Sequence, residues 1–392
     1  MSSDLEHPAP STSSAPPPAK RQKQRRSSSL NKPSSSTTPP LGKFLASSDK
    51  STRDKAVASL SRFLSAGRLN HLGPLAAGAQ EDVEEDEELP VGDLNWDEEY
   101  EVDARLQPLE MAKLWKGVYY CFWMSDKPLV QQALAQNLAD LTLDVRPRSK
   151  SKNGRVERFR SAMTYLRGFW EAIIREWSTL DHHRLDKFLL LMRRFTHVGF
   201  RLLEREQWDE RAIEEYNAML TGPGGPLDVT NDKVPLSLAY HLFDIYLDEL
   251  DRVASSSPDS STLPLLALLS PMYSVAAHAP LQVMFARLVD NVFTPLLDAL
   301  LGPKPEPNPK RRRGNAAKRA KERAYPALRA AARRAAGVDD AVEEVAADAR
   351  IGKQVLRRLF EEGGKEETGE AQRRRIYNFV TEREVDFEEQ EN

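Results

Sequence analysis

Apolar residues recur at spacings of three and four through much of the chain between residues 41 and 301. One such stripe consists of Met111, Leu114, Trp115, Val118, Tyr119, Phe122 and Trp123. This spacing places the apolar side chains on one face of an α-helix, whereas a strand buried on one side requires alternation with period two. No segment alternates in that way over a useful length. Because runs of β-branched residues and hairpin dipeptides are also missing between the apolar segments, the sequence predicts an all-α fold.

The expected helices are bounded by capping residues, first-turn prolines and terminal glycines. They span residues 51–66, 108–123, 128–141, 156–177, 182–203, 208–220, 235–253, 263–278 and 280–301. Helices of about 15 to 25 residues, arranged as successive antiparallel pairs with broad apolar faces, are typical of a HEAT-like α-solenoid. A globular helical bundle is the structural alternative.

The chain also divides by composition. Residues 1–40 hold almost no large apolar side chain and predict a disordered basic tail. The helical domain spans 41–301 and contains an acidic flexible insertion at 67–105, where the carboxylates of EDVEEDEE repel one another. Residues 302–314 predict a proline-rich, basic linker. Residues 315–392 predict a basic helical extension with an acidic end, in which an Ala-rich helix forms a charged rod with little apolar stripe.

The net charge of -3 conceals strong segregation, because 56 basic and 59 acidic residues nearly balance. Residues 304–334 hold twelve basic residues against two acidic ones, and the loop RPRSKSKNGR at 146–155 is also basic. Basic segments bind nucleic acid by neutralising phosphates and releasing counterions, without reading sequence. The side chains predicted to contact RNA are Lys310, Arg311, Arg312, Arg313, Lys318, Arg319, Lys321, Arg146, Arg148, Lys150 and Lys152.

A further basic cluster lies in the N-terminal tail, in the sequence KRQKQRR. Its basic residues are Lys20, Arg21, Lys23, Arg25 and Arg26. Such a cluster fits the acidic groove of a nuclear import receptor, so it is a candidate import signal. The alternative is a solvated charge run that keeps the tail soluble.

No motif of catalytic chemistry stands out. Cys121 is the only cysteine, so an intrachain disulfide and a thiolate metal cluster are excluded, and its apolar neighbours predict a core position. His182 and His183 are adjacent at a helix start, where we expect them to point in different directions as surface or capping residues. No glycine-rich phosphate loop precedes a helix, and no apolar run approaches the ~20 residues of a membrane span. We therefore expect no enzyme, cofactor, metal, small-molecule substrate or membrane partner.

Two long segments resemble the ribosomal RNA-processing protein 1 family, also called the Nop52 family. They are LGKFLASSDKSTRDKAVASLSRFLS at 41–65 and LEMAKLWKGVYYCFWMSDKPLVQQALAQNLADL at 109–141. The segments 159–195 and 235–250 agree with the family in character and order, so the resemblance covers roughly 41–301. The chain after that point is only generically similar.

The resemblance implies a nucleolar, non-catalytic assembly factor of the large ribosomal subunit, with a helical, HEAT-like fold. Such a protein acts on early pre-60S particles, is needed for processing of the internal spacer and the 5.8S and 25S/28S precursors, and binds precursor rRNA, other assembly factors and ribosomal proteins. A karyopherin-like helical adaptor in nuclear transport is the alternative, and an RNA-modifying enzyme would need a cofactor site that the sequence does not reveal. At the turn of the family segment, Ser125, Asp126 and Lys127 are expected to be exposed, as partner contacts or helix caps, while Trp115 and Trp123 anchor the core.

Overall fold

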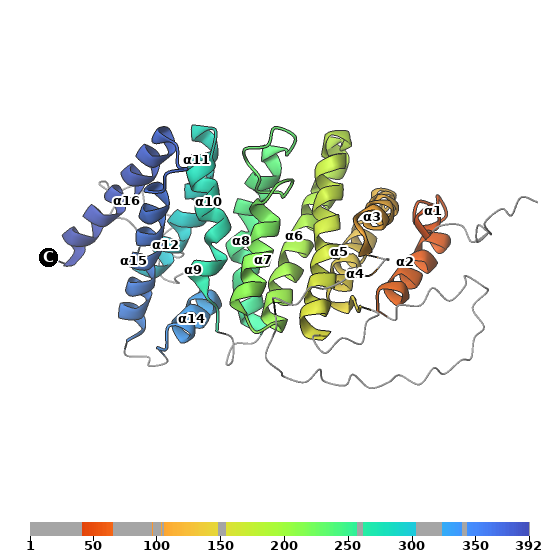
Figure 1. The fold of residues 1–392 in the computed structure, drawn as a ribbon, viewed down its shortest axis with the longest axis horizontal. Coiled ribbons are helices and arrows are strands. Elements are labelled where there is room, and N and C mark those ends of the chain that lie inside the picture. The colour runs from red at the N-terminus through yellow and green to blue at the C-terminus, as the bar shows by residue number, and fades with distance from the viewer. Residues whose placement is uncertain are drawn as a thin grey trace, which may run out of the picture. The chain divides into compact units, whose positions relative to one another are not determined.

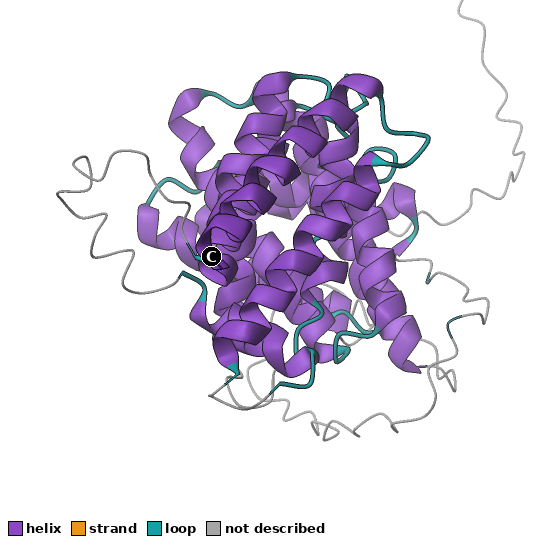
Figure 2. Ribbon diagram, turned by 90° about the vertical axis from the view of Figure 1, so that its left-hand side faces the viewer, coloured by secondary structure: helices purple, strands orange, loops and turns teal. Residues whose placement is uncertain are grey.

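The computed structural model describes residues 41–65, 96, 103, 106–147, 154–256, 262–302, 324–338 and 343–391, with side chains as far as Arg383. All regular structure in these residues is helical, which confirms the predicted all-α class (Figures 1 and 2). The helices are α1 (Leu41–Leu45), α2 (Lys50–Ser65), α3 (Pro108–Trp123), α4 (Pro128–Asp144), α5 (Gly154–Glu176), α6 (His182–Arg205), α7 (Glu210–Thr221), α8 (Leu236–Ser256), α9 (Leu265–Leu268), α10 (Ser270–His278), α11 (Gln282–Leu288), α12 (Thr294–Leu301), α14 (Pro326–Ala335), α15 (Glu344–Gly363) and α16 (Glu370–Glu391).

Helices two apart in the chain make the most extensive contacts in the first half of this array. α1 packs on α3 and α3 on α5, while α2 packs on α4, α4 on α6 and α6 on α8. Alternate helices therefore form two layers, one with α1, α3, α5 and α7 and the other with α2, α4, α6 and α8 (Figure 1). The consecutive helices α3 and α4 do contact each other, but less extensively than each contacts its neighbours in its own layer.

An aromatic core joins α3, α5 and α6 around Trp115. Its indole lies 4.8 Å from the Tyr165 ring and 5.5 Å from those of Phe169 and Phe195, measured between centroids. The indole Nε1 donates a hydrogen bond to the Tyr165 carbonyl at 3.0 Å, which satisfies its one polar group. Gly168 makes room for this arrangement, because a Cβ there would stand 2.5 Å from Trp115 Cδ1. The predicted role of Trp115 as a core anchor is confirmed, since only 2% of its surface is exposed.

A second close approach explains the glycine of the LWKG segment. A Cβ on Gly117 of α3 would stand 2.7 Å from the Cα of Gly42 in α1, which is too close for two carbon atoms that are not bonded to each other. Glycine at both positions lets the two backbones touch, and the buried Leu45 of α1 joins the core beside them. The two segments that carry the family resemblance are therefore in direct contact.

Two expected helices are interrupted at prolines. The segment expected as one helix at 263–278 is divided into α9 and α10, with Pro271 in the first turn of α10. The segment expected at 280–301 is divided by a π-helical stretch, Val289–Phe293, just before Pro295. Proline has no N–H to donate to the carbonyl four residues earlier, so the regular α-helical ladder cannot run through it.

The acidic insertion expected at 67–105 is anchored at Trp96. The Trp96 ring packs edge-on against Phe159 with centroids 5.5 Å apart, and its carbonyl accepts a hydrogen bond from Arg160 Nη2 at 3.0 Å. Arg160 also pairs with Glu215 of α7, at 2.7 Å. The expectation of a flexible insertion is therefore wrong at this tryptophan, because aromatic burial and a charge-assisted hydrogen bond hold it on α5. The acidic run at 81–88 lies outside the described residues.

The helices after residue 302 pack onto those before it. α14 lies on α8, α15 on α12, and both α15 and α16 contact α10. Leu328, Val355 and Ile376 are fully buried in the same apolar core as the earlier helices. The predicted boundary after residue 301 therefore does not separate two packed bodies, because these three helices have apolar faces that need a partner. All described residues fall in one compact unit, Pro39–Asn392.

The expectation of a charged rod over residues 315–336 is wrong for α14. Its N-terminus is capped by Asp251 of α8, whose carboxylate accepts a hydrogen bond from the backbone N–H of Leu328 at 2.8 Å. Arg329 and Arg333 both pair with the fully buried carboxylate of Asp348, at 2.8 and 3.0 Å. Two of the charges counted in the basic segment are thus neutralised inside the fold.

Candidate nucleic-acid interface

The basic loop between α4 and α5 is described at its two ends, while Arg148, Lys150 and Lys152 lie outside the described residues. At the first end, the backbone N–H of Arg146 donates to the Leu64 carbonyl of α2 at 2.9 Å. At the second end, Arg155 Nε pairs with Glu206 at 2.8 Å. The Glu206 carboxylate links Arg155 to Arg205 at the end of α6, and the charge of Arg146 is close enough to lower the pKa of Arg205.

The C-terminus of α4 binds two further arginines. The Leu143 carbonyl accepts hydrogen bonds from Arg205 Nη1 at 3.1 Å and from Arg158 Nη2 at 3.5 Å. Carbonyls in the last turn of a helix have no partner within the helix and carry partial negative charge, so cations stabilise them. Glu206, almost fully buried, also pairs with Arg205 Nε at 2.9 Å. We call the four converging guanidinium groups the loop-root cluster: Arg146, Arg155, Arg158 and Arg205.

The electrostatics of the loop-root cluster favour an added anion. Burial lowers the pKa of Arg205; the Glu206 carboxylate acts in the opposite direction, and the charges of Arg146 and Arg155 lower the pKa further. Guanidinium groups nevertheless stay charged at neutral pH, so the cluster keeps neighbouring like charges near each other. A phosphate would relieve this repulsion and accept planar, charge-assisted hydrogen bonds. The cluster fastens α4 to α5 and α6, and its guanidinium groups are of the chemical type that binds phosphate.

Ser125, at the turn between α3 and α4, is not exposed as expected. Only 4% of its surface is accessible, and its hydroxyl donates to the Phe122 carbonyl at 2.7 Å. Its own carbonyl accepts from Lys187 Nζ at 2.8 Å and from Gln131 Nε2 at 2.9 Å. The N-cap of α4 is Lys127, without a side-chain cap, so Ser125 and Asp126 do not cap that helix either. Contacts from α6 cover the serine, so the prediction of Ser125 as an exposed partner contact is wrong.

Lys187 of α6 fastens this turn. Its ammonium group donates hydrogen bonds to the carbonyl of Trp123, at 2.6 Å, and to that of Ser125. These bonds give a partner to backbone carbonyls at the C-terminal end of α3. Burial lowers the pKa of Lys187 to about 8, and the nearby charge of Arg184 lowers it as well. Arg184 in turn lies over the Trp123 ring, 4.5 Å from its centroid. Trp123 is partly buried against the core.

Asp126 and Lys127 are exposed at the same turn, beside Leu129, whose side chain is 79% exposed. Exposure leaves these two charged residues available to a partner. Their assignment as partner contacts stays a prediction.

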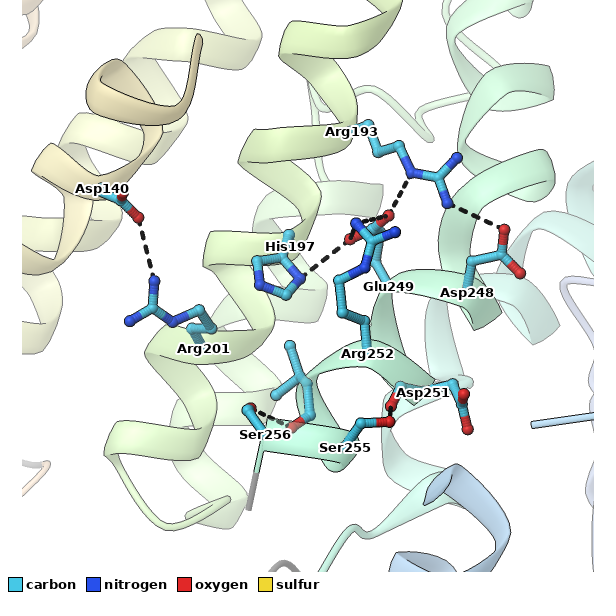
Figure 3. Close-up of polar contacts among 11 residues, drawn as sticks. Asp140, Arg193, His197, Arg201, Asp248, Glu249, Asp251, Arg252, Ser255 and Ser256 are labelled. Atoms are coloured by element: carbon cyan, nitrogen blue, oxygen red, sulfur yellow. Dashed lines mark hydrogen bonds and ion pairs between the residues drawn. The ribbon is translucent and has the colours of Figure 1, made fainter. Parts of the chain in front are cut away.

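A buried carboxylate that sequence reasoning missed joins α6 to α8 (Figure 3). Glu249 is fully buried, and its carboxylate pairs with Arg193, with Arg252 at 3.1 Å, and with His197 Nδ1 at 3.0 Å. Burial by itself raises the pKa of Glu249, but the hydrogen bonds and charges of these partners outweigh it and lower the pKa. The cluster cross-links α6 to α8. In the sequence, Glu249 follows the apolar Tyr246 by one turn on the same side of α8, and this position was the signal that could have predicted its burial.

Cys121 and the adjacent histidines His182 and His183 are not arranged as a catalytic site. Cys121 is buried, as predicted, and burial raises its pKa to about 11, so the reactive thiolate is disfavoured. His182 and His183 are exposed, but their rings lie against each other with centroids 3.7 Å apart instead of pointing in different directions. The N-cap is Asp181, which accepts from the Arg184 N–H at 3.0 Å.

The described residues contain no group of three or more His, Cys, Asp or Glu side chains placed to hold a metal ion. Among them, too, no helix has the length and apolar character needed to cross a membrane. The predicted RNA-contact residues Lys310, Arg311, Arg312, Arg313, Lys318, Arg319 and Lys321 and the import residues Lys20, Arg21, Lys23, Arg25 and Arg26 lie outside the described residues.

Most of the chain is similar to known proteins. A family model described as the nucleolar protein Nop52 matches residues 36–378, which extends well beyond the expected limit at residue 301. Ribosomal RNA processing protein 1 homolog A of Mus musculus is 29% identical over 196 residues, or 49% of this chain and 35% of the mouse protein. Homolog B of Homo sapiens is 27% identical over 263 residues, or 65% of this chain and 27% of the human protein. The homolog of Drosophila melanogaster is 31% identical over 148 residues, or 37% of this chain and 19% of that protein. The chain thus spans about a third or less of the length of these relatives.

Proposed function

Because the chain belongs to the Nop52 family of nucleolar proteins, we propose that it is a non-catalytic factor of ribosome biogenesis. In this proposal it acts on early nucleolar pre-60S particles and is required for processing of precursor rRNA, including the internal spacer and the 5.8S and 25S/28S precursors. The observation that carries the proposal is the family match over residues 36–378, together with relatives named for ribosomal RNA processing. Its partners are precursor rRNA, other large-subunit assembly factors, ribosomal proteins and an import receptor.

The two-layered packing of helices supports a scaffold role. Successive helices alternate between the two layers, and each packs on the helix two further along the chain. This arrangement is typical of a HEAT-like α-solenoid. Such arrays present long surfaces on which several partners bind at once. We assign α1 to α8 to an array of this type, with the later helices packed onto its end.

The loop-root cluster supports contact with RNA. It brings four guanidinium groups to the point where a basic loop leaves the fold, and phosphate is the anion that such groups bind best. The loop residues Arg148, Lys150 and Lys152 and the segment from Lys310 to Lys321 would add contacts with the backbone. Recognition of this kind is governed by charge and shape, not by base sequence.

A complementation experiment tests the processing role. Cells depleted of the endogenous protein are supplied with this chain, and precursor rRNA is followed by northern blotting. We expect precursors of 5.8S and 25S/28S rRNA to accumulate on depletion and to fall when the chain is supplied. Unchanged precursor levels on depletion would contradict the proposal, and stable binding to nuclear pore proteins without pre-ribosomes would favour the transport adaptor.

A reporter fusion tests import separately. Residues 1–40 fused to a fluorescent protein should accumulate in the nucleus, and replacing Lys20, Arg21, Lys23, Arg25 and Arg26 by Ser should abolish the accumulation. A cytoplasmic reporter would reject the N-terminal signal and leave the basic residues from Lys310 to Lys321 as the candidate.

A further inference from the structure

The solvent face of α15 is a basic stripe that sequence reasoning did not single out. Arg350, Lys353 and Arg357 follow one another at spacings of three and four, which places them on one side of the helix. The side chains of Arg350 and Arg357 are 62% and 81% exposed. The opposite side of the helix is apolar and buried, with Val355 and Leu359 in the core.

The same stripe ends on an exposed aromatic ring. Phe360, one turn after Arg357, is 50% exposed although it is a large apolar side chain. Its ring stacks on Tyr377 of α16, with centroids 4.6 Å apart and planes at 24°. Tyr377 is held in turn against Gly363, where a Cβ would stand 2.9 Å from the tyrosine ring. The phenylalanine ring is therefore fixed in place while half of its surface faces solvent.

The carboxylates paired with the arginines of the stripe do not neutralise them firmly. Glu343 lies 3.6 Å from Arg350, and Glu361 lies 3.0 Å from Arg357 and 3.5 Å from Arg358. All of these groups are exposed, and exposed ion pairs contribute little free energy because water and salt screen them. A phosphate can displace such a carboxylate from its arginine, because guanidinium binds phosphate in a bidentate manner.

The dimensions of the stripe suit a short stretch of a polynucleotide. Ten residues separate Arg350 from Phe360, which is about 15 Å of helix at a rise of 1.5 Å per residue. At 3.4 Å per stacked nucleotide, that length corresponds to about four nucleotides. Cations along a backbone and an aromatic ring for a base are the two elements of single-strand recognition.

We propose that this surface, which we call the α15 face (Arg350, Lys353, Arg357 and Phe360), binds single-stranded RNA. The three cations bind phosphates, and one unpaired base stacks on Phe360. A duplex does not fit, since its bases are stacked on each other and cannot reach the ring. The inference rests on the proposed function and deepens it by adding a second RNA contact to the loop-root cluster.

Binding of a short, labelled oligouridine to the full chain tests the proposal by fluorescence anisotropy across a salt series. The charge variant combines Arg350→Ser, Lys353→Ser and Arg357→Ser. Its matched control combines Lys55→Ser, Lys113→Ser and Lys116→Ser, which removes three exposed cations from α2 and α3. We expect the charge variant to bind at least tenfold more weakly and to lower the salt slope by about 2, at ~0.7 for each lost phosphate contact. The control should retain the affinity and slope of the unaltered chain.

The stacking contact is tested by Phe360→Ala and by Phe360→Leu, which keeps an apolar side chain against Tyr377 if alanine disturbs the packing of α16. Both should weaken oligouridine binding about tenfold while leaving the salt slope and the binding of duplex RNA unchanged. Equal affinities for the α15-face variants and the control variant would overturn the inference. So would loss of a protein partner from the variants while oligouridine binding is retained, because the α15 face would then contact protein.

Co-sedimentation with pre-ribosomes distinguishes this failure from failure of the proposed function. If the unaltered chain sediments with precursor particles but the α15-face variants bind oligouridine normally, the inference fails and the function stands. If the unaltered chain does not sediment with precursor particles, the proposed function itself fails.

Discussion

Gly168 and Gly117 both lie where a side chain would collide with a neighbouring helix. At Gly168 the collision would be with the indole of Trp115, and at Gly117 it would be with the backbone of α1. The register of apolar residues was sufficient to predict that Trp115 and Cys121 are buried. It did not predict which glycines are required, because that depends on how closely two helices approach.

Replacement of Gly168 by alanine tests the close packing of α3 on α5. The added Cβ would meet Trp115 Cδ1 at 2.5 Å, so the core must shift, and we expect a loss of about 1–3 kcal/mol in the free energy of unfolding. Gly364→Ala is the matched control, because its nearest neighbour would be 3.4 Å from the new Cβ and its φ is negative. Urea denaturation of both variants gives the comparison, and equal stabilities would contradict the packing described.

The buried Glu249 predicts a pH dependence of stability. Its pKa is lower in the folded than in the unfolded chain, so its contribution is present above the unfolded pKa and is lost as the pH falls through the folded pKa. Glu249→Gln should therefore be less stable than the unaltered chain at pH 7, by about 3–5 kcal/mol, with a gap that narrows below about pH 4.5. Urea titrations at several pH values measure the gap, and a gap that widens in acid would show that the carboxylate is not stabilised in the fold.

Among the elements, the helices themselves were predictable because each carries a stripe of period 3.6, whereas their interruptions and docking sites were not. The breaks at Pro271 and Pro295 occur because proline has no N–H to donate. The stripe of apolar residues runs on through both prolines, so the stripe alone predicts uninterrupted helices. The burial of Ser125 could not be predicted from its own segment, because Lys187, which covers its turn, lies 62 residues away in the chain. The docking of α14 depends on Asp251 and Asp348, whose proximity to it only the tertiary structure reveals.

Lys187 is expected to hold the end of α3. Lys187→Met leaves the carbonyls of Trp123 and Ser125 without this donor, so the protein should lose about 1–3 kcal/mol of stability at pH 7. Because burial lowers the pKa of Lys187 to about 8, the unfolded chain binds more protons between that value and the ordinary one. Stability of the unaltered chain should therefore rise relative to the variant between pH 8 and about 10.4. Thermal denaturation over this range measures the effect, and a fall in the relative stability would contradict the burial of the amine.

The docking of α14 is expected to depend on Asp348. Asp348→Asn removes the carboxylate that Arg329 and Arg333 share and leaves Arg333 only its pair with Glu344 at 3.2 Å among the described residues, and we expect a loss of about 3–5 kcal/mol. Amide hydrogen exchange should become faster in α14 first, since its contacts with α15 and α8 weaken together. Glu343→Gln, at an exposed pair with Arg350, is the control and should change stability by less than about 0.5 kcal/mol. Unchanged exchange in α14 would show that apolar packing alone docks the helix.

On the scale of the whole molecule, the charge segregation of the chain and its family resemblance indicated a nucleolar scaffold that contacts RNA. The family match extends this resemblance to residue 378 and includes α14, α15 and the first part of α16, which composition had separated as an extension. Composition could not reveal that their apolar faces complete the same core. The structure adds two basic surfaces within the described residues: the loop-root cluster, from residues 146–205, and the α15 face, from residues 350–360.

In the proposed function, this chain joins early pre-60S particles through direct contact with precursor rRNA. Ultraviolet crosslinking in cells, followed by purification of the tagged full chain and sequencing of the bound RNA, tests it most directly. We predict crosslinked fragments from the internal spacer and the adjoining 5.8S and 25S/28S precursor, in particles that also contain large-subunit assembly factors. Recovery of the chain without precursor rRNA, or with small-subunit precursors alone, would contradict the account.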